Sequence, residues 1–348
     1  TTADPRDALP IVEQPLADRW RRTIRYLRVS VTDRCNYRCA YCMPLEGWAP
    51  VERADLLSLE EIARVVRALA PHGVERVRVT GGEPLVRKGV VDLVGWLADT
   101  PGVREVAMTT NGHLLERFAG PLWSAGLRTL NVSVDTFDAD RFAAVTRGGD
   151  LARVQAGLDA ARAAGFEDIR INAVALRDVN DGDLAAAFVE RCWAQGLLPR
   201  FIELMPVGGL PFQTDRHRVT TSDLLTALRR RYDLVSEGRP RGTMPRGPAA
   251  YWRVEGGAFA GRRVGLISPM SDDGFCAACN RARLTARGGL RACLANDDEV
   301  SILQTVRAGA SDAALVALCR QAVEGKLEAH RMGAADIVPL TVMTGIGG

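Results

Sequence analysis

The segment Leu27-Arg-Val-Ser-Val-Thr-Asp-Arg-Cys35-Asn-Tyr-Arg-Cys39-Ala-Tyr-Cys42 joins a run of alternating apolar and polar residues directly to three cysteines. Alternation with a period of two predicts a β-strand that has Leu27 on one face and Arg28 on the other. A loop that follows such a strand lies at the carboxyl end of a parallel sheet, where barrel enzymes carry their chemistry. We therefore expect these cysteines, the first cysteine group, to form part of an active site.

Further along the chain, similar strands alternate with helical patterns such as 58–70 and 151–165, which indicates repeated βα units around a parallel sheet. The expected strands are 25–31, 76–80, 105–110, 129–134, 169–174 and 200–205. Their polar, arginine-bearing faces do not fit the apolar filling of a closed eight-stranded barrel. We predict an α/β fold, an incomplete (β/α)6 TIM-type barrel that is open at the side and holds a polar ligand.

After Met205 the chain becomes rich in glycine and proline, with one helical pattern at 222–232 and β-hairpin material at 251–267. This change in pattern predicts a domain boundary near residue 235. We expect three parts: a flexible N-terminal lead-in over 1–20, the partial barrel over 21–235, and a smaller C-terminal α+β domain over 236–348 that carries a second group of cysteines.

Composition narrows the possible partners. The chain is 47% apolar and 25% charged, with a net charge of +3 and no basic tract, so neither nucleic acid nor a membrane is an expected partner. The first 15 residues are polar and contain no hydrophobic signal segment, which favours a reducing, cytoplasmic location for the eight cysteines. Cys192 and Cys319 stand among apolar helical neighbours and are expected to be core thiols. Lys88 and Lys326 are the only lysines.

The spacing of the first cysteine group, Cys-x3-Cys-x2-Cys, favours an iron–sulfur cluster. Three thiolates leave one iron of a four-iron cluster without a protein ligand, so that iron is open to a small molecule. The alternative is zinc in a non-catalytic binding module, but structural zinc takes four ligands and no fourth Cys or His lies nearby in the sequence. The second strand ends in Gly81-Gly82-Glu83-Pro84, and glycine permits close approach of another group to the backbone.

A second cysteine group, Cys276, Cys279 and Cys293, again has three members. It fits either a second cluster with an open iron or a zinc ribbon that recruits a fourth ligand. Arg281 and Arg283 come shortly after Cys279 and share one face of an extended segment. Further arginines lie on the inner faces of the expected strands, at Arg28, Arg78, Arg170 and Arg200. Because the guanidinium fork suits phosphate, this cationic interior predicts a polyphosphate substrate.

Several motifs together resemble the GTP 3′,8-cyclase family of the radical S-adenosylmethionine (SAM) superfamily. They are Cys35-Asn-Tyr-Arg-Cys-Ala-Tyr-Cys-Met-Pro, Arg78-Val-Thr-Gly-Gly-Glu-Pro-Leu, Thr109-Thr-Asn-Gly, Asn131-Val-Ser-Val-Asp, Arg200-Phe-Ile-Glu-Leu-Met-Pro, Cys276-x2-Cys-Asn-Arg-Ala-Arg-Leu and the Gly-Gly terminus. The resemblance covers about residues 24 to 348. It implies conversion of GTP to (8S)-3′,8-cyclo-7,8-dihydro-GTP, the first step of molybdenum cofactor biosynthesis, in which an adenosyl radical takes hydrogen from ribose C3′ and the carbon radical attacks guanine C8. A different radical SAM enzyme with an auxiliary cluster, acting on a peptide or a sugar, is the other alternative.

The resemblance also assigns residues. It implies two [4Fe-4S] clusters, the first held by Cys35, Cys39 and Cys42 and the second by Cys276, Cys279 and Cys293. It implies SAM contacts at Tyr41, Gly82, Ser133 and Met205. It implies GTP contacts at Arg28, Arg78, Thr109, Arg170, Arg281, Ala282 and Arg283. Many relatives have lysine at 170, and arginine there keeps the charge with a different geometry. Catalytic roles fall to Arg28, Arg281, Arg283 and a Gly347-Gly348 tail that reaches the active site.

The family further implies protein partners. These are a small electron donor of the flavodoxin or ferredoxin type, and a cyclic pyranopterin monophosphate synthase that consumes the product. We expect the chain to act as a monomer or a homodimer.

Overall fold

The computed structural model describes residues 14–49, 51–240, 247–332 and 343–347. Its first half consists of βα units whose strands pair in parallel and in chain order. The strands are β1 (Tyr26–Ser30), β2 (Arg76–Thr80), β3 (Glu105–Thr110), β4 (Thr129–Ser133), β5 (Asp168–Ala175) and β6 (Leu198–Glu203). The helices are α1 (Leu59–Leu69), α2 (Val90–Ala98), α3 (Leu115–Ser124), α4 (Ala139–Thr146), α5 (Leu151–Ala163) and α6 (Gly182–Ala194). The six predicted strands are confirmed, with boundaries within two residues.

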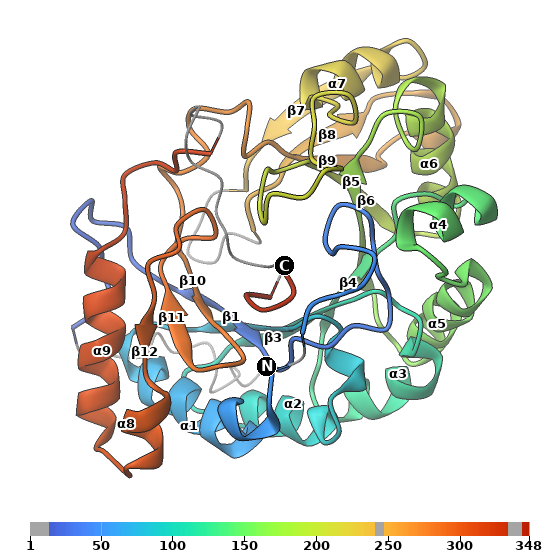
Figure 1. The fold of residues 1–348 in the computed structure, drawn as a ribbon. Helices are drawn as coiled ribbons and strands as arrows, with labels where there is room; N and C mark the ends of the chain where they lie inside the picture. Colours follow the sequence, from blue (N-terminus) through green and yellow to red (C-terminus); the bar gives the residue numbers. More distant parts are fainter. Residues whose placement is uncertain (1–13, 50, 241–246, 333–342, 348) are drawn as a thin grey trace, which may run out of the picture.

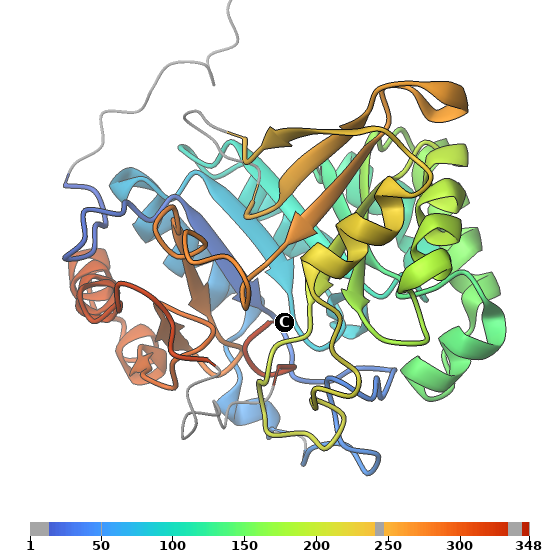
Figure 2. The same ribbon diagram turned by 90° about the horizontal axis from the view of Figure 1, so that it is seen from above.

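The two faces of these strands have different neighbours. Val77 and Val79 of β2 are fully buried in the main apolar core, which lies between the curved sheet and the surrounding helices (Figures 1 and 2). Arg78 of the same strand lies on the inner face and lines a cavity. The predicted partial barrel with a polar interior is therefore confirmed.

The C-terminal part adds strands to both edges of this sheet. Its elements are α7 (Thr221–Arg229), β7 (Leu234–Gly238), β8 (Ala250–Val254), β9 (Arg263–Ile267), β10 (Arg281–Leu284), β11 (Gly289–Arg291), β12 (Val300–Ser301), α8 (Leu303–Arg307) and α9 (Asp312–Glu324). Short 3-10 turns occupy Arg53–Asp55, Ala70–His72, Pro84–Val86 and Gly257–Phe259. Strand β9 pairs in parallel with β6, and β10 pairs in parallel with β1.

The result is one 12-stranded sheet in the order β12-β11-β10-β1-β2-β3-β4-β5-β6-β9-β8-β7. An open barrel leaves its first and last strands with unpaired backbone groups, and the C-terminal strands pair with both. The C-terminal segment thus has the predicted α and β elements, but it continues the sheet of the barrel rather than forming a sheet of its own. The division at residue 235 stays a prediction.

The N-terminal lead-in differs from the flexible segment predicted over 1–20. Residues 14–20 pack against the protein: Leu16 is buried, its N–H donates to the His72 carbonyl (3.1 Å), and Ala17 bridges to Thr23. Residues 1–13 lie outside the described residues.

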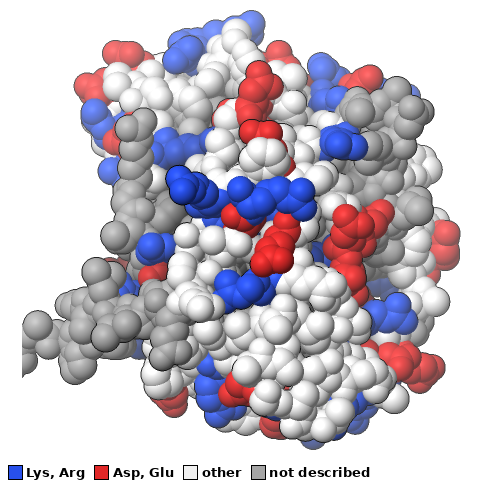
Figure 3. Space-filling view, turned by 90° about the vertical axis from the view of Figure 1, so that its left-hand side faces the viewer, with Lys and Arg blue, Asp and Glu red and all other residues white. Residues whose placement is uncertain are grey.

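Other features agree with the sequence. Cys192 and Cys319 are buried thiols, as predicted. None of the helices among the described residues has the length and apolarity needed to cross a membrane. On the side of the molecule where α8 and α9 lie, Figure 3 shows basic and acidic side chains next to one another, in keeping with the small net charge.

Candidate active site

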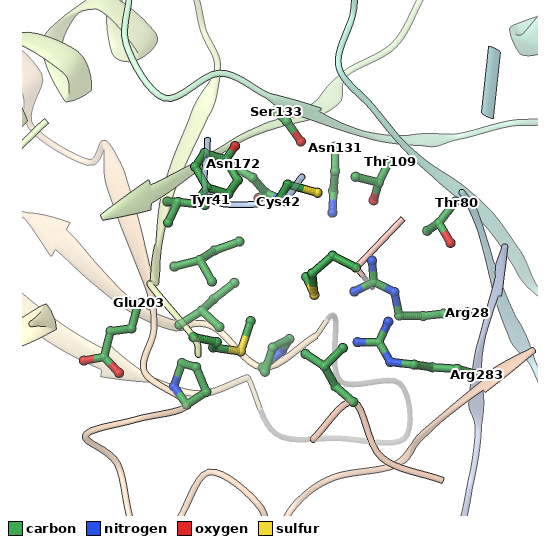
Figure 4. A pocket seen from close by; sticks show the side chains of 18 of the residues that line it. Arg28, Tyr41, Cys42, Thr80, Thr109, Asn131, Ser133, Asn172, Glu203 and Arg283 are labelled. Atoms are coloured by element: carbon green, nitrogen blue, oxygen red, sulfur yellow. The ribbon is translucent and has the colours of Figure 1, made fainter. Parts of the chain in front are cut away.

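A cavity of about 320 Å³ occupies the interior of the partial barrel. Both cysteine groups line it: Cys35, Cys39 and Cys42 of the first, and Cys276, Cys279 and Cys293 of the second. Figure 4 shows Arg28 and Arg283 extending into it side by side, with Tyr41 on the opposite side. The cavity therefore unites two sequence motifs that lie more than 200 residues apart.

The first cysteine group sits on a tight loop after β1. The N–H groups of Cys42 (2.9 Å) and Met43 (3.0 Å) both donate to the Cys39 carbonyl, which closes a turn. Between the cysteines, the Ala40 N–H donates to Val145 at the end of α4 (2.9 Å). The Tyr37 N–H points at the Cys35 sulfur (3.4 Å). The bonds of Ala40, Cys42 and Met43 join backbone groups alone, so they do not depend on the cysteine side chains.

The three thiols of this group influence one another. Burial raises the pKa of Cys35 to about 11 and that of Cys42 to about 12, and the proximity of Cys35 and Asp135 adds to the effect on Cys42. Burial and the neighbouring Cys42 raise the pKa of Cys39 well above its usual value. Three clustered thiols that are this hard to ionise need a strongly cationic partner to become thiolates. The group therefore fits the irons of a cluster.

The glycines after β2 touch the backbone of the cysteine loop. A Cβ atom on Gly82 would lie 2.4 Å from the Arg34 carbonyl oxygen, and one on Gly81 would lie 2.8 Å from that of Thr32. The Gly82 N–H donates to the Thr32 carbonyl (2.7 Å). The group that closely approaches these two glycines is thus the backbone of the cysteine loop. Gly82 also lines the cavity.

Substitution of Gly82 by alanine is expected to displace the cysteine loop, because a carbonyl at 2.4 Å cannot move away as a flexible side chain can. Overpacking of this kind costs about 1–3 kcal/mol. We expect Gly82→Ala to lower both the free energy of unfolding and the iron content after reconstitution. Gly95→Ala in α2 is the matched control, since no atom lies within 4 Å of its added Cβ. Equal iron content in the two variants would contradict the prediction.

Two buried carboxylates support the site and were not assigned from the sequence. Glu83 accepts hydrogen bonds from the Leu85 N–H (3.0 Å), the Thr110 hydroxyl (2.8 Å) and the Asn111 N–H (2.7 Å). Burial raises the pKa of Glu83 to about 7, and these donors limit the rise. Asn111 in turn contacts the Cys35 sulfur (3.9 Å). Glu83 therefore ties the ends of β2 and β3 to the cysteine loop.

The second carboxylate is Asp135, which follows β4. It accepts a hydrogen bond from the Tyr41 hydroxyl (2.9 Å) and another from the Val174 N–H (2.8 Å), and burial raises its pKa to about 6. Tyr41 lies between two cysteines in the sequence, so Asp135 fixes the orientation of the loop. The alternation that places Asn131 and Ser133 inward also places Asp135 inward. This alternation is the sequence pattern from which Asp135 could have been identified as a site residue.

The second cysteine group has a more cationic surrounding. The Cys279 N–H donates to the Cys276 carbonyl (3.0 Å). Burial disfavours ionisation of Cys279, but hydrogen bonding to Arg281 and the charges of Arg281 and Lys326 outweigh it and lower the pKa to about 6. Burial raises the pKa of Cys276. Three thiols on one wall, one of them easily ionised, fit a cluster held by three thiolates.

Pairing of β10 with β1 fixes where the two groups lie. Because these strands are parallel and Tyr26 is opposite Arg281, Cys279 lies before the start of the pair and Cys35 lies beyond its end. The two cysteine groups thus stand at opposite ends of β1 and β10. Arg28 and Arg283, which are partners in the same register, lie between them.

Five arginines line the cavity between the cysteine groups, and they are Arg28, Arg78, Arg200, Arg281 and Arg283. Burial and mutual repulsion lower the pKa of Arg28 and of Arg200 to about 10, although nearby tyrosines oppose the shift. The pKa of Arg283 is held well below its usual value by burial and by Arg28 and Arg281. Within the described residues, Arg78, Arg200, Arg281 and Arg283 have no carboxylate at ion-pair distance. Unneutralised buried cations indicate an anionic ligand.

Most of the predicted ligand contacts line this cavity. They are Tyr41, Gly82, Ser133 and Met205 of the SAM set, and Arg28, Arg78, Thr109, Arg281 and Arg283 of the GTP set. Arg78 donates to the Tyr26 hydroxyl and to the Met108 carbonyl (3.3 Å). The contacts of the SAM set with SAM and of the GTP set with GTP stay predictions.

Arg170 and Ala282 are placed differently. Arg170 is on the inner face of β5, but its guanidinium is buried against the Asp168 carboxylate in a bidentate pair and is not among the cavity-lining residues. Ala282 belongs to the apolar core on the other face of β10. The Arg170 Nη1 has no hydrogen-bond partner among the described residues, and a GTP contact of Arg170 stays a prediction.

The chain end lies inside the barrel. Arg283 donates to the Gly347 carbonyl (2.7 Å) and to the Ile346 carbonyl (3.2 Å), and Thr344 lines the cavity (Figure 1). Gly347 has a φ of +71°, and an added Cβ would lie 2.1 Å from the Thr80 hydroxyl. Glycine is thus required by both backbone and space. Gly348 lies outside the described residues.

Substitution of Gly347 by alanine is expected to expel the tail from the cavity, because both its φ and the Thr80 contact oppose a Cβ. We expect cyclised product to fall at least about tenfold, the effect of losing one charged hydrogen bond of about 1.5–3 kcal/mol. SAM binding, measured by equilibrium dialysis, is expected to stay unchanged. Gly309→Ala is the control. Gly309 also has a positive φ, but a Cβ added to it would meet no atom within 4 Å. Full cyclase activity of Gly347→Ala would refute a role of the tail.

Comparison with known proteins agrees with this geometry. Residues 29–189 match the Radical SAM superfamily, and residues 199–332 match Molybdenum Cofactor Synthesis C. The GTP 3′,8-cyclase of Pelotomaculum thermopropionicum is 42% identical over 318 residues, which are 91% of this chain and 95% of that protein. The chain belongs to the GTP 3′,8-cyclase family. The GTP 3′,8-cyclase of Pseudomonas putida strain W619 is 45% identical over 299 residues, covering 86% of this chain and 87% of that protein.

A solved structure supports the fold alone. The crystal structure of Streptococcus suis SuiB bound to S-adenosylmethionine has a TM-score of 0.57 at 14% identity, covering 85% of this chain and 68% of that one.

Family membership rules out the two alternatives that the sequence left open, a zinc-bearing binding module and a radical SAM enzyme for a peptide or sugar. Enzymes of the radical SAM superfamily bind a [4Fe-4S] cluster and SAM, and the first cysteine group fits this cluster.

Proposed function

We propose that this chain converts GTP to (8S)-3′,8-cyclo-7,8-dihydro-GTP, the first step of molybdenum cofactor biosynthesis. One observation carries the proposal: buried arginines lie between two three-cysteine groups at opposite ends of one cavity, and among the described residues neither Arg78 nor Arg283 has a carboxylate at ion-pair distance. A triphosphate supplies the negative charge that the arginines need. Its guanosine can then extend toward either group.

The first cysteine group would hold the [4Fe-4S] cluster that binds SAM, with Tyr41, Gly82, Ser133 and Met205 as the surrounding wall. When bound, the cluster and SAM together supply a 5′-deoxyadenosyl radical as the hydrogen-abstracting group. Asp135 keeps Tyr41 in place, and Glu83 keeps the loop against β2 and β3. The protein thereby holds the reactive position relative to the substrate.

The second cysteine group would hold a second [4Fe-4S] cluster with one open iron, which the family suggests for contact with guanine. Arg28, Arg78, Arg281 and Arg283 would bind the triphosphate, and Thr109 would add a hydroxyl next to Arg78 (3.4 Å). The tail from Thr344 to Gly347 fills part of the cavity and excludes water from it. Exclusion of water protects a carbon radical until C3′ and C8 of GTP are joined.

We also propose two protein partners. A small electron donor of the flavodoxin or ferredoxin type would supply one electron for SAM cleavage and a second electron that, with a proton, reduces the cyclised radical to the product. A cyclic pyranopterin monophosphate synthase would take the cyclised nucleotide.

A single assay tests the proposed reaction. The anaerobically reconstituted chain is mixed with GTP, SAM and dithionite, and the products are separated by liquid chromatography with mass detection. We expect 5′-deoxyadenosine and a cyclic isomer of GTP to form together, and deuterium at C3′ of GTP to appear in 5′-deoxyadenosine. ATP in place of GTP is the control for base selection. Absence of both products from a chain with full iron content would overturn the proposal.

A further inference from the structure

Lys326 is a buried lysine just beyond the end of α9. Lys326 is only 3% exposed, whereas Lys88, the only other lysine, is exposed. The ammonium donates to the Arg281 carbonyl (2.8 Å) and to the Ala292 carbonyl. Arg281 comes two residues after Cys279, and Ala292 immediately precedes Cys293. One ammonium thus ties together the two chain segments that carry Cys279 and Cys293.

The segment that carries Lys326 is itself fixed to the remaining cysteine of the group. Arg22 donates to the Glu328 carbonyl (2.7 Å) and to the Cys276 carbonyl (2.9 Å). The Trp20 indole N–H donates to the Lys326 carbonyl (3.2 Å). The packed N-terminal segment therefore clamps residues 326–328 against the loop of Cys276. Lys326 thus contacts the segments of Cys279 and Cys293, and Arg22 links the loop of Cys276 to Glu328, two residues after Lys326.

The charge of Lys326 needs a partner. In the part of the chain that the structure describes, no carboxylate lies at ion-pair distance from the ammonium. A buried charge is stable only when it is paired and hydrogen-bonded. The two carbonyl partners of Lys326, on the chain segments next to Cys279 and Cys293, place the ammonium beside the second cysteine group.

A compact ammonium suits this place. It makes two hydrogen bonds to carbonyls on different segments and has a third donor left, whereas the planar fork of arginine favours two oxygens of one group. A cluster held by Cys279 and Cys293 would lie near this ammonium. A nearby cation stabilises the reduced form of such a cluster, which carries one more negative charge, and so would raise its reduction potential. The same contact can thus hold the site together and set its redox behaviour.

We propose that Lys326 is a positioning residue for the second cluster: it joins the Cys279 and Cys293 segments and favours the reduced state of the cluster. The inference rests on the second cluster of the proposed function. The full chain is studied in a Cys35→Ala, Cys39→Ala, Cys42→Ala background, so that iron and the electron paramagnetic resonance signal report on the second group alone. Lys326→Met removes charge and donors, Lys326→Arg keeps the charge, and Lys88→Met is the matched control.

The background protein is expected to hold about four irons after anaerobic reconstitution. We expect Lys326→Met to retain less than half of this iron and to shift the reduction potential of the remaining cluster downward in a dithionite-poised titration. Lys326→Arg is expected to recover most of the potential, and Lys88→Met is expected to match the background protein. Thermal unfolding by circular dichroism shows whether each variant is folded.

Other outcomes separate the two hypotheses. A background protein without iron would overturn the second cluster and, with it, the role of Lys326. Equal iron and equal potential in the background protein and Lys326→Met would overturn the role of Lys326 and leave the second cluster standing. Equal losses in Lys326→Met and Lys326→Arg, together with a lower unfolding temperature in both, would identify a general folding role and overturn positioning of the cluster.

Discussion

Replacement of Cys42 by alanine is expected to reduce 5′-deoxyadenosine formation to background. The first cysteine group offers three thiols, and a cluster that keeps one iron open for SAM needs all of them. The loop itself is expected to stay folded, because it is held by backbone bonds such as Ala40 N–H to Val145 (2.9 Å) rather than by the Cys42 side chain. Chromatography of the SAM-cleavage products measures the effect.

Two readouts accompany this variant. Iron analysis is expected to show loss of about half of the iron, with the second cysteine group still loaded. Cys192→Ala is the matched control, because Cys192 is a buried thiol in α6 away from the cavity. Substantial 5′-deoxyadenosine formation by Cys42→Ala would contradict the assignment of the first group. An equal loss in Cys192→Ala would show that the effect is one of folding.

Replacement of Arg283 by methionine is expected to weaken GTP binding by about 10- to 100-fold, the equivalent of about 1.5–3 kcal/mol for one charged hydrogen bond. The same change is expected to raise the unfolding temperature of the ligand-free protein. Burial, together with repulsion by Arg28 and Arg281, holds the pKa of Arg283 well below the usual value. Methionine fills similar space without the charge.

Isothermal titration with GTP and thermal unfolding measure the two effects. Arg229→Met is the control, since Arg229 is exposed on α7. SAM binding to Arg283→Met is expected to be unchanged, because Tyr41, one of the proposed SAM contacts, lies across the cavity from Arg283 (Figure 4). GTP affinity equal to that of the unsubstituted chain would refute a phosphate role. A lower unfolding temperature would show that the bonds from Arg283 to the tail outweigh the repulsion.

Sequence patterns predicted the strands well because each strand buries one face and exposes the other to a polar cavity. The period of two in β1 and β2 follows from that local geometry alone. The surroundings of Arg170 show what these patterns do not reveal. The predicted strand began at 169, whereas β5 begins at Asp168, and this one-residue difference hid a carboxylate on the same face that pairs with Arg170. An arginine on an inner face can therefore be paired with a carboxylate of its own strand, and its contact with GTP stays a prediction.

The packing of the chain ends was also outside the reach of local patterns. Residues 14–20 are polar and contain proline, which favours a flexible segment, yet Leu16 is buried and Arg22 reaches Cys276 across 254 positions. Glycines 81 and 82 were expected to make room for a ligand, and their Cβ positions are occupied by the backbone of Thr32 and Arg34. Such contacts depend on which segments meet in space.

The sequence by itself determined the chemistry, because the spacing of three cysteines within eight residues restricts what they can bind, and no folding is needed to read it. The second cysteine group and the arginines after it were equally visible. Only the tertiary structure decided how they combine. Parallel pairing of β10 with β1 sets the two groups at opposite ends of one cavity and Arg283 beside Arg28, a contact between segments about 250 residues apart. Sheet edges pair with whichever strand the whole fold brings to them, so this arrangement is a property of the complete chain.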